Sequence, residues 1–234
     1  MHTLLLKFAG PLQSWGTKSH FENRHTDLYP SKSAVIGIIA ACMGLRRDQD
    51  EQINKLNEIS FAVREDQKGG LLRDYHIAKK IKPNGEFERN YVTNRYYLED
   101  AIFVVAIGHE NKDFIDVIEE SLKNPYFQPY LGRRSLPINN DFILYRTEIG
   151  VIESLEKCPW KASNWYMKRS NNKLNIYADY ELVKADMTNI RSDRVKSFSF
   201  KERKFINRLE GHIEMKVEAE SIDTSHDIFR FIGD

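Results

Sequence analysis

Cysteines are scarce in this 234-residue sequence, and long apolar runs are absent. The two cysteines, Cys42 and Cys158, form no CxxC pair, which argues against a disulfide scaffold or a zinc ribbon and suits a reducing cytosol. No stretch reaches the roughly 18 uninterrupted apolar residues that a membrane-spanning helix needs. The apolar segment 4–8 is too short for a signal peptide and contains Lys7. We therefore expect a cytoplasmic protein that has no contact with a membrane.

The common motifs of catalysis and cofactor binding are also missing. The sequence contains no GxxxxGK[ST] phosphate loop, no HExxH metal pair and no GxSxG nucleophile motif. His20 and His25 share one loop but lack a cysteine or carboxylate set beside them, so we expect neither a metal nor another cofactor. His76, with Tyr75 and Lys79 nearby, could act as a general base in metal-free RNA cleavage. A structural or RNA-contacting histidine explains the same residues, and we expect no catalytic residue.

The formal net charge of +1 conceals blocks of opposite sign. The balance is +4 over residues 1–47 and +5 over 191–208, but −5 over both 99–123 and 209–234. Such blocks on a nearly neutral chain indicate at least two different partner surfaces, unless they are solvated faces that happen to share a sign.

The apolar pattern predicts an α+β fold in the first 150 residues. A hairpin is expected within 71–97, with its turn at Pro83-Asn84-Gly85. Removing this hairpin leaves strand–helix–strand twice in succession, which is the order of a ferredoxin-like fold. We expect an antiparallel sheet with both long helices on one face. The expected strands are 3–8, 59–65, 101–108 and 142–149, and the expected helices are 33–45, with Ser31 as N-cap and Gly44 near its end, a short one at 51–58, and 112–123.

The pattern weakens after residue 150. Aromatic residues are scattered among polar ones there, and the expected strands at 174–185 and 212–218 are less clear. We therefore predict a ferredoxin-like domain over residues 1–150 and a smaller β-rich C-terminal region, 151–234, packed on it.

Two loops have the composition of phosphate sites. Ser31, Lys32 and Ser33 open the apolar helix, where free N–H groups and the helix dipole favour an anion. Gly132 would let the backbone approach a ligand closely, and the paired guanidinium groups of Arg133 and Arg134 after it can fork onto phosphate oxygens. Simple helix capping and a solvated arginine pair remain the alternatives.

Two further segments interleave basic and aromatic residues. Basic residues follow a nucleic-acid backbone, and aromatic rings stack on the bases of single strands. An ordinary exposed surface would also be charged, and this is the alternative explanation of the pattern. The first segment is the hairpin, with Lys79, Lys80, Lys82, Arg89 and Arg95 among Tyr75, Phe87, Tyr91, Tyr96 and Tyr97; the second is 191–208, where Lys196, Lys201, Arg203 and Lys204 bracket Phe198, Phe200 and Phe205.

In this order the motifs closely resemble the CasD family, the fifth Cas family in its type I-E form. The motifs are AGPLQSWG (9–16), RHT (24–26), PSKSAVIG (30–37), LRDYH (72–76), YLEDAIF (97–103) and PYLGRRS (129–135). The resemblance covers residues 3 to about 146, with a looser match over 194–203.

This resemblance implies a subunit of Cascade, the CRISPR surveillance complex of antiviral defence. Members have the ferredoxin-like fold of the RAMP superfamily with an inserted β-hairpin thumb, here at about 77–97. They hold the 5′ handle of the CRISPR RNA and contact a backbone subunit and the large PAM-reading subunit. The family members themselves therefore contact target DNA only indirectly. Type I-E members are not catalytic, whereas type I-C relatives are metal-independent endoribonucleases, which gives the alternative function. A generic RNA-binding protein outside Cascade is a third possibility.

The chemistry of the residues and the resemblance together give one set of candidate RNA contacts. These are Gln13, Trp15, Arg24, Ser31, Lys32, Ser33, Arg73, Tyr75, His76, Lys79, Lys80, Arg95, Arg133 and Arg134.

Overall fold

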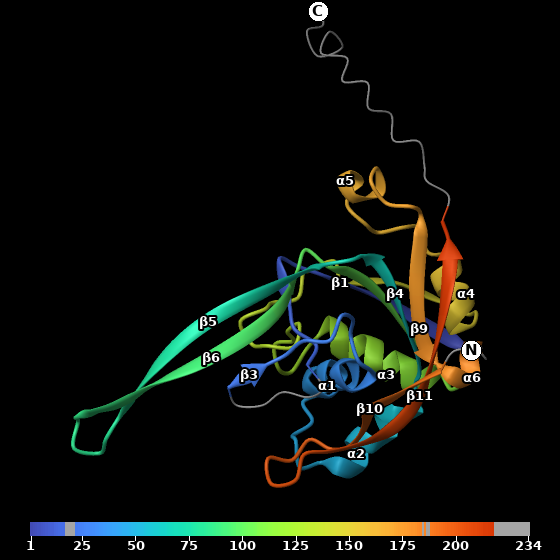
Figure 1. Ribbon diagram of the computed structural model, residues 1–234. Helices are drawn as coiled ribbons and strands as arrows, with labels where there is room; N and C mark the ends of the chain where they lie inside the picture. Colours follow the sequence, from blue (N-terminus) through green and yellow to red (C-terminus); the bar gives the residue numbers. More distant parts are fainter. Residues whose placement is uncertain (17–21, 184, 186–187, 218–234) are drawn as a thin grey trace, which may run out of the picture.

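A seven-stranded antiparallel sheet forms the centre of the protein (Figure 1). The computed structural model describes residues 1–16, 22–183, 185 and 188–217. The strand order is β10-β11-β9-β4-β7-β1-β8. The bounds are β1 His2–Ala9, β4 Ser60–Gln67, β7 Ile102–His109, β8 Ile143–Thr147, β9 Lys173–Asp179, β10 Thr188–Ser197 and β11 Lys204–Lys216. The predicted α+β class is confirmed.

Apolar side chains cover the central strands on both faces. In β1, Leu4 and Leu6 belong to the larger hydrophobic cluster, whereas Leu5 between them belongs to a smaller cluster on the other face. Successive side chains of a strand point to opposite faces, so a strand covered on both sides needs a continuous apolar run. This explains why β1 and β7 are apolar throughout rather than alternating.

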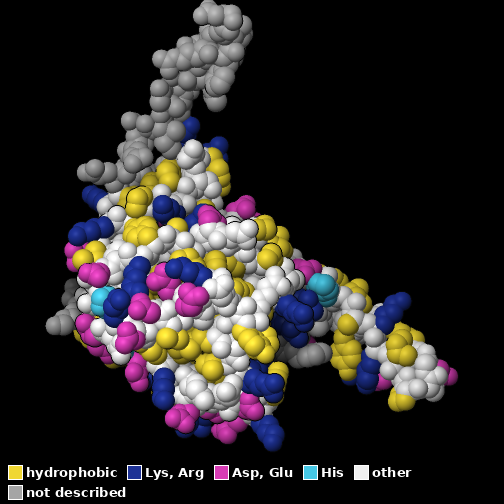
Figure 2. Space-filling view, turned by 180° about the vertical axis from the view of Figure 1, so that it is seen from behind, with side chains coloured by type: hydrophobic (Ala, Val, Ile, Leu, Met, Phe, Trp, Pro, Cys, Tyr) yellow, Lys and Arg dark blue, Asp and Glu magenta, His cyan; other side chains and the backbone are white. Residues whose placement is uncertain are grey.

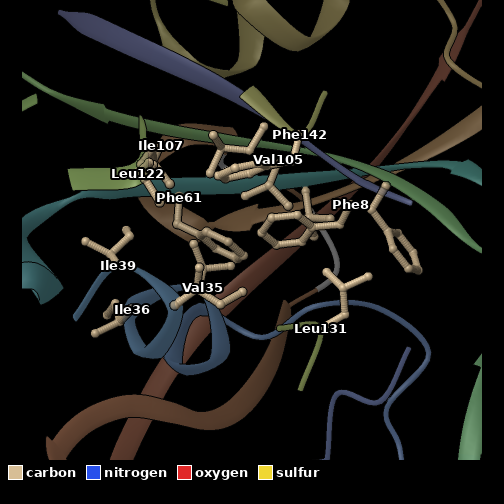
Figure 3. Close-up of a cluster of buried hydrophobic side chains, with 14 of the residues drawn as sticks. Phe8, Val35, Ile36, Ile39, Phe61, Val105, Ile107, Leu122, Leu131 and Phe142 are labelled. Atoms are coloured by element: carbon tan, nitrogen blue, oxygen red, sulfur yellow. The ribbon is translucent and has the colours of Figure 1, made fainter. Parts of the chain in front are cut away.

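Helices α1 (Lys32–Cys42) and α3 (Lys112–Lys123) cover one face of the sheet. Val35, Ile36 and Ile39 of α1 meet Phe8, Phe61 and Val105 of the sheet in the larger cluster (Figure 3). Gly44 adopts a positive φ of 76° two residues after α1, which ends the helix as its position predicted.

Both long helices lie on one face, as expected, but a further short helix covers the other face, which the expected arrangement did not include. Helix α4 (Val151–Lys157) packs on the opposite face, where Val151 and Leu155 contact Leu5, Val104 and other residues of the smaller cluster. This helix is not evident from the sequence, because it is only two turns long and lies in a region with no clear periodicity.

Strands β5 (Gly70–Ile81) and β6 (Phe87–Glu99) form a long hairpin that projects from the body (Figure 1). Its turn lies at residues 82–86, as the Pro-Asn-Gly sequence predicted, with Gly85 at a φ of 86°. The short strands β2 (Leu12–Gln13) and β3 (Asn23–Arg24) pair with the base of β6. The base of β6 is thereby anchored in the core through Tyr97 and Leu98, while the distal half is exposed.

The C-terminal strands extend the same sheet. β9 pairs with β4, and β11 pairs with both β9 and β10. The sheet therefore has no break at residue 150. The strand expected at 174–185 ends at Asp179 and continues into the short helix α6 (Tyr180–Val183), and the short helix α5 (Asn164–Met167) precedes it. Residues 218–234, including most of the acidic block at 209–234, lie outside the described residues, as does His20.

The exposed edge of β10 is covered in its middle by one side chain. Helix α2 (Asp50–Lys55) and the following turn Leu56–Glu58 lie beside β10. Asn57 donates Nδ2–H to the Val195 carbonyl at 2.9 Å and accepts the Val195 N–H at Oδ1 at 3.0 Å. This side chain thus takes the place of a neighbouring strand. Over the described ranges, no helix has the length and hydropathy needed to cross a bilayer.

A candidate nucleic-acid interface

A cleft of about 1570 Å³ lies beside α1. Its walls are α1 with the following residues 45–48, the loop 127–133, and residues 198–205, which form the turn between β10 and β11 and the start of β11. Figure 1 shows that turn below α1, close to α2. Residues as far apart in the sequence as Ser14 and Phe205 thus line one groove.

The cleft is strongly positive. Six of the residues that line it are Lys or Arg, and only Asp48 is acidic. A groove with this balance attracts a polyanion, because few carboxylates on its walls compete with phosphates for the cations. The six are Arg24, Arg46, Arg47, Arg133, Lys201 and Arg203.

Small residues of α1 form part of the floor of the cleft. Ala34, Gly37 and Ala41 line it at intervals of three and four residues, so they share one face of the helix. The sequence predicted a helix buried on most sides, whereas this face borders the open cleft. Because these side chains are short, the backbone of a ligand can approach the helix closely at this face.

Two arginines on the rim lie against aromatic rings. The Arg47 guanidinium is 4.4 Å from the centre of the Phe200 ring, and that of Arg203 is 5.2 Å from the Phe205 ring. Desolvation, reinforced by the nearby Arg47 charge, lowers the pKa of Arg203. Among the described residues, neither guanidinium has a carboxylate within ion-pair distance. Phe200 is 86% exposed although Arg47 lies against its ring, so two cations and an accessible ring meet on this side of the cleft.

The start of α1 is not the anion site that its sequence predicted. The Lys32 backbone N–H, one of the free N–H groups of the first turn, donates to Asp193 Oδ2 at 2.9 Å. The Lys32 ammonium is buried against Asp179 at 2.9 Å, and burial lowers the pKa of Lys32. A carboxylate of the chain itself therefore occupies the place of the expected phosphate, and the assignment of Lys32 to RNA contact is corrected.

Ser31 and Ser33 have internal roles as well. Ser31 is the N-cap, as predicted, and its Oγ accepts the Ala34 N–H at 3.3 Å. Its hydroxyl also lies 3.1 Å from that of Ser33. Both serines border the cleft, but both are buried. The part of α1 that a ligand in the cleft can reach is therefore its small-residue face and not its N-terminus.

Arg208 is the centre of the ionic network below the helix start. Its guanidinium donates to Asp193 at 2.8 and 2.9 Å, to Asp179 at 3.1 Å and to Glu210 at 2.8 Å. Arg191 extends the network to Asp27 at 2.8 Å. The network thereby connects α1 and the loop before it to β9, β10 and β11.

Gln13 and Trp15 belong to the interior. The Gln13 amide donates to the Phe8 and Ala101 carbonyls and accepts the Trp15 indole N–H at 3.1 Å. Both side chains are at most 1% exposed, and the Trp15 ring stacks on Phe8. The expectation that they bind RNA is corrected: they hold the loop after β1 against the sheet, although Trp15 borders the cleft.

Arg133 and Arg134 differ in their position relative to the cleft. Arg133 lines the cleft, lies 4.2 Å from the Tyr97 ring centre, and donates to the Arg24 and Tyr96 carbonyls. Its Nη1 is buried without a hydrogen-bond partner among the described residues. Arg134 is exposed and does not line the cleft.

Gly132 is required by the protein itself rather than by a ligand. It has a φ of 88°, and a Cβ there would lie 1.6 Å from the Ser14 carbonyl oxygen. The close approach that the sequence suggested is therefore to the loop after β1, which brings Arg133 to the cleft.

The hairpin candidates lie on two different faces. Directly paired residues of neighbouring antiparallel strands share a face, and the register places His76, Lys80 and Arg95 on one face. Arg73, Tyr75 and Lys79 lie on the other. On the first face, His76 Nε2 is 2.6 Å from the Asp74 carboxylate, and Lys80 pairs with Glu88 at 2.7 Å.

Each face of the distal hairpin has its own chemistry. We call the face that carries His76, Lys80 and Arg89 the cationic face. The Arg89 guanidinium lies over the Tyr91 ring on this face. The other we call the apolar face, although Lys79 lies on it. Its large side chains are between 42% and 57% exposed and comprise Tyr75, Ile77, Ile81, Phe87 and Val92. Figure 2 shows both apolar and basic side chains along the hairpin.

Sequence reasoning missed Arg46 and Arg47 as members of the site. They follow an apolar helix with no aromatic interleaving, and only the tertiary fold brings them to Phe200 and Arg203. Residues 198–205 had been identified by their basic and aromatic pattern, but their position opposite α1 could not be read from that pattern.

Comparisons with known proteins give one consistent family. The model of a family described as CRISPR-associated proteins (Cas_Cas5) matches residues 3–208. The chain is 33% identical to the CRISPR system Cascade subunit CasD of Escherichia coli (strain K12) over 156 residues, which is 60% of this chain and 69% of that protein.

Solved structures agree with this. A chain of a CRISPR RNA-guided surveillance complex matches with a TM-score of 0.78 and 29% identity, covering 98% of this chain and 99% of the other. The crystal structure of a Cas protein matches with a TM-score of 0.65 and 30% identity, covering 93% and 95%.

Replacing Asp193 by alanine should destabilise the protein strongly. The change leaves the buried Arg208 guanidinium short of a partner and leaves the Lys32 backbone N–H without its acceptor. Breaking a buried pair by removing one partner costs about 3–5 kcal/mol. Urea unfolding would measure this, with the exposed Asp48→Ala as control, which should change the unfolding free energy by less than about 0.5 kcal/mol. A loss below about 1 kcal/mol for Asp193→Ala would contradict the importance given to the network.

Proposed function

This chain belongs to the Cas5 family of CRISPR-associated proteins, and we propose that it is the Cascade subunit that binds the 5′ handle of the CRISPR RNA. The observation that carries the proposal is the cleft, with its six cations and single carboxylate. The related Cascade subunit CasD and the related chain of an RNA-guided surveillance complex support it. In this role the protein works in the cytoplasm, in antiviral surveillance.

A single RNA strand suits the cleft better than a duplex. Aromatic side chains line it together with the cations, and unpaired bases can stack on them. Phe200 offers an exposed ring between Arg47 and the solvent. In our proposal the handle backbone crosses the small-residue face of α1, and Arg47 and Arg203 bind its phosphates.

The hairpin continues the RNA path in this proposal. The strands β8-β1-β7-β4 with α1 and α3 follow the ferredoxin-like order that RAMP proteins share, and we take the hairpin as the inserted thumb. Arg133 borders the cleft and lies on the Tyr97 ring, which is on the cationic face. The RNA would pass from the cleft along Arg95, His76 and Lys80.

The apolar face of the hairpin is proposed to meet protein. A single strand of RNA does not need several exposed aliphatic side chains, whereas a patch of exposed apolar residues is typical of protein contacts. We assign this face to the neighbouring Cascade backbone subunit. The large PAM-reading subunit would then contact another surface, and target DNA would be met through guide pairing rather than by this chain.

We propose no catalytic role. His76 is oriented by Asp74, which is the observation that favours the alternative of a metal-independent endoribonuclease. A general base alone does not complete the reaction, because the leaving 5′ oxygen needs a proton donor. The neighbouring Lys80 is already paired with Glu88.

Replacing Arg47 and Arg203 by alanine should weaken handle binding and its salt dependence. Each phosphate contact on a single strand contributes about 0.7 to the slope of log K against log salt, so the double variant should flatten it by about 1.4. Fluorescence anisotropy with labelled handle RNA at several salt concentrations measures this. Lys55→Ala with Lys112→Ala, on the exposed sides of α2 and α3, is the control. An unchanged slope in a folded Arg47/Arg203 variant would remove the cleft from the RNA path.

Substitutions on the two faces of the hairpin should separate RNA binding from assembly. Ile77→Ser with Val92→Ser should abolish co-purification with the backbone subunit but leave RNA affinity within about twofold, because neither residue belongs to a core cluster. Lys80→Ala with Arg89→Ala is the matched pair on the cationic face and should weaken RNA binding several-fold. Equal effects of both pairs on both readouts would contradict the assignment of the faces.

The isolated protein should leave precursor CRISPR RNA intact. Incubation of labelled precursor without metal, followed by denaturing electrophoresis, tests this directly, with His76→Ala beside the unchanged chain. Specific cutting within the repeat that disappears in His76→Ala would establish the endoribonuclease instead.

A further inference from the structure

Residues 157–173 form a basic segment far from the cleft. The segment contains five Lys or Arg residues and no Asp or Glu, although the whole chain has nearly equal numbers of both signs. It includes α5, which lies at the top of Figure 1, whereas the turn between β10 and β11 lies at the bottom. The five are Lys157, Lys161, Lys168, Arg169 and Lys173.

A buried ion pair holds the start of this segment in place. Arg64 and Asp66 of β4 are both fully buried and pair through two hydrogen bonds of 2.6 and 2.8 Å. The same guanidinium donates to the carbonyls of Leu155, Cys158 and Pro159. Outside the ion pair, the guanidinium thus binds the backbone at residues 155–159.

Further hydrogen bonds attach the middle of the segment to the end of β4. The Trp160 indole N–H donates to the Asp66 carbonyl at 2.7 Å, and the Lys161 N–H donates to the Asp66 carboxylate at 2.6 Å. The Ser163 N–H donates to Gln67 Oε1 at 2.9 Å, and the Tyr166 hydroxyl accepts the Lys68 N–H at 3.2 Å. The backbone from 158 to 166 is thus fixed in spite of its irregular structure.

This fixed support displays an aromatic ring and free cations. The Trp165 side chain is 54% exposed, and its ring meets Tyr166 edge to face at 5.7 Å. Lys157 and Lys173 are paired with Glu153 and Glu214. Within the described part of the chain, Lys161, Lys168 and Arg169 have no carboxylate partner.

We propose that residues 161–169 are a second nucleic-acid contact, which takes a single strand. Trp165 would stack on an unpaired base, and Lys168 and Arg169 would bind flanking phosphates. Stacking requires a base that is free of a duplex, which favours a single strand over paired DNA or RNA. A single strand of RNA and one of DNA share this chemistry, and the experiment below distinguishes them. The contact goes beyond the proposed handle binding and does not depend on it.

The experiment uses the full chain carrying Arg47→Ala and Arg203→Ala, so that binding in the cleft is weakened. Tryptophan emission is measured during titration with oligothymidylate, oligouridylate and a mixed-sequence duplex. Trp15 is buried and Trp160 only partly exposed, so stacking on Trp165 should quench the exposed component. Trp165→Phe should abolish the quenching.

Charge reversal tests the phosphate contacts. Lys168→Glu with Arg169→Glu should weaken single-strand binding about tenfold, and Trp165→Ala should weaken it about fivefold or more. Lys55→Glu with Lys112→Glu changes the net charge equally at distant positions and should weaken it by less than about threefold. A comparison of the affinities for oligothymidylate and oligouridylate then shows whether the ligand is single-stranded DNA or RNA.

Three results would overturn the proposal. The first is no quenching by either single strand, and the second is equal quenching in the Lys168/Arg169 variant. The third is stronger binding of the duplex, or of a polyglutamate peptide, which would assign the segment to paired nucleic acid or to an acidic protein. None of these results bears on binding of the handle in the cleft, because the cleft arginines are already replaced in this chain.

Discussion

The arrangement of the molecule depends on how the Arg208 guanidinium is neutralised inside the protein. A buried charge is tolerated only when its partners are close and well oriented, and Arg208 finds Asp179, Asp193 and Glu210 on three neighbouring strands. The same carboxylates bind the ammonium and the backbone N–H of Lys32 at the start of α1. The position of α1 on the sheet is therefore tied to strands that lie about 150 residues later in the chain.

This internal neutralisation explains where the protein has positive charge available. Lys32, Arg191 and Arg208 are used within the network, so they contribute little to the attraction of a polyanion. The arginines and lysine around the cleft have one carboxylate among them. The chain thus separates its structural cations, which are paired inside the protein, from the cations that line the cleft, and a count of charges along the sequence does not reveal this.

Much of the fold could be predicted from local patterns. The strands at the centre, helix α3, the N-cap at Ser31 and the hairpin turn at 83–85 all follow from periodicity and turn chemistry that act over a few residues. The candidate site was harder, because a basic residue near a helix start predicts a phosphate ligand only if no carboxylate of the chain reaches it first. Asp193 does reach it, and nothing near Lys32 in the sequence indicates that. Likewise, the approach of residues 198–205 to α1 depends on the pairing of β11 with β9, which is a tertiary property.

The pairing of β9 with β4 has a consequence for synthesis of the protein on the ribosome. The first 147 residues contain strands β1, β4, β7 and β8 and helices α1 and α3, yet β9, which is the second neighbour of β4 beside β7, and the carboxylates that bind the start of α1 follow only between residues 173 and 193. Until those residues have left the exit tunnel, the nascent chain exposes an unpaired strand edge and an uncompensated lysine. Completion of the native state must therefore wait until most of the polypeptide has been translated, and contacts this distant in sequence form slowly. A gene fragment that ends near residue 150 would encode these strands and helices without the charges that hold the first helix.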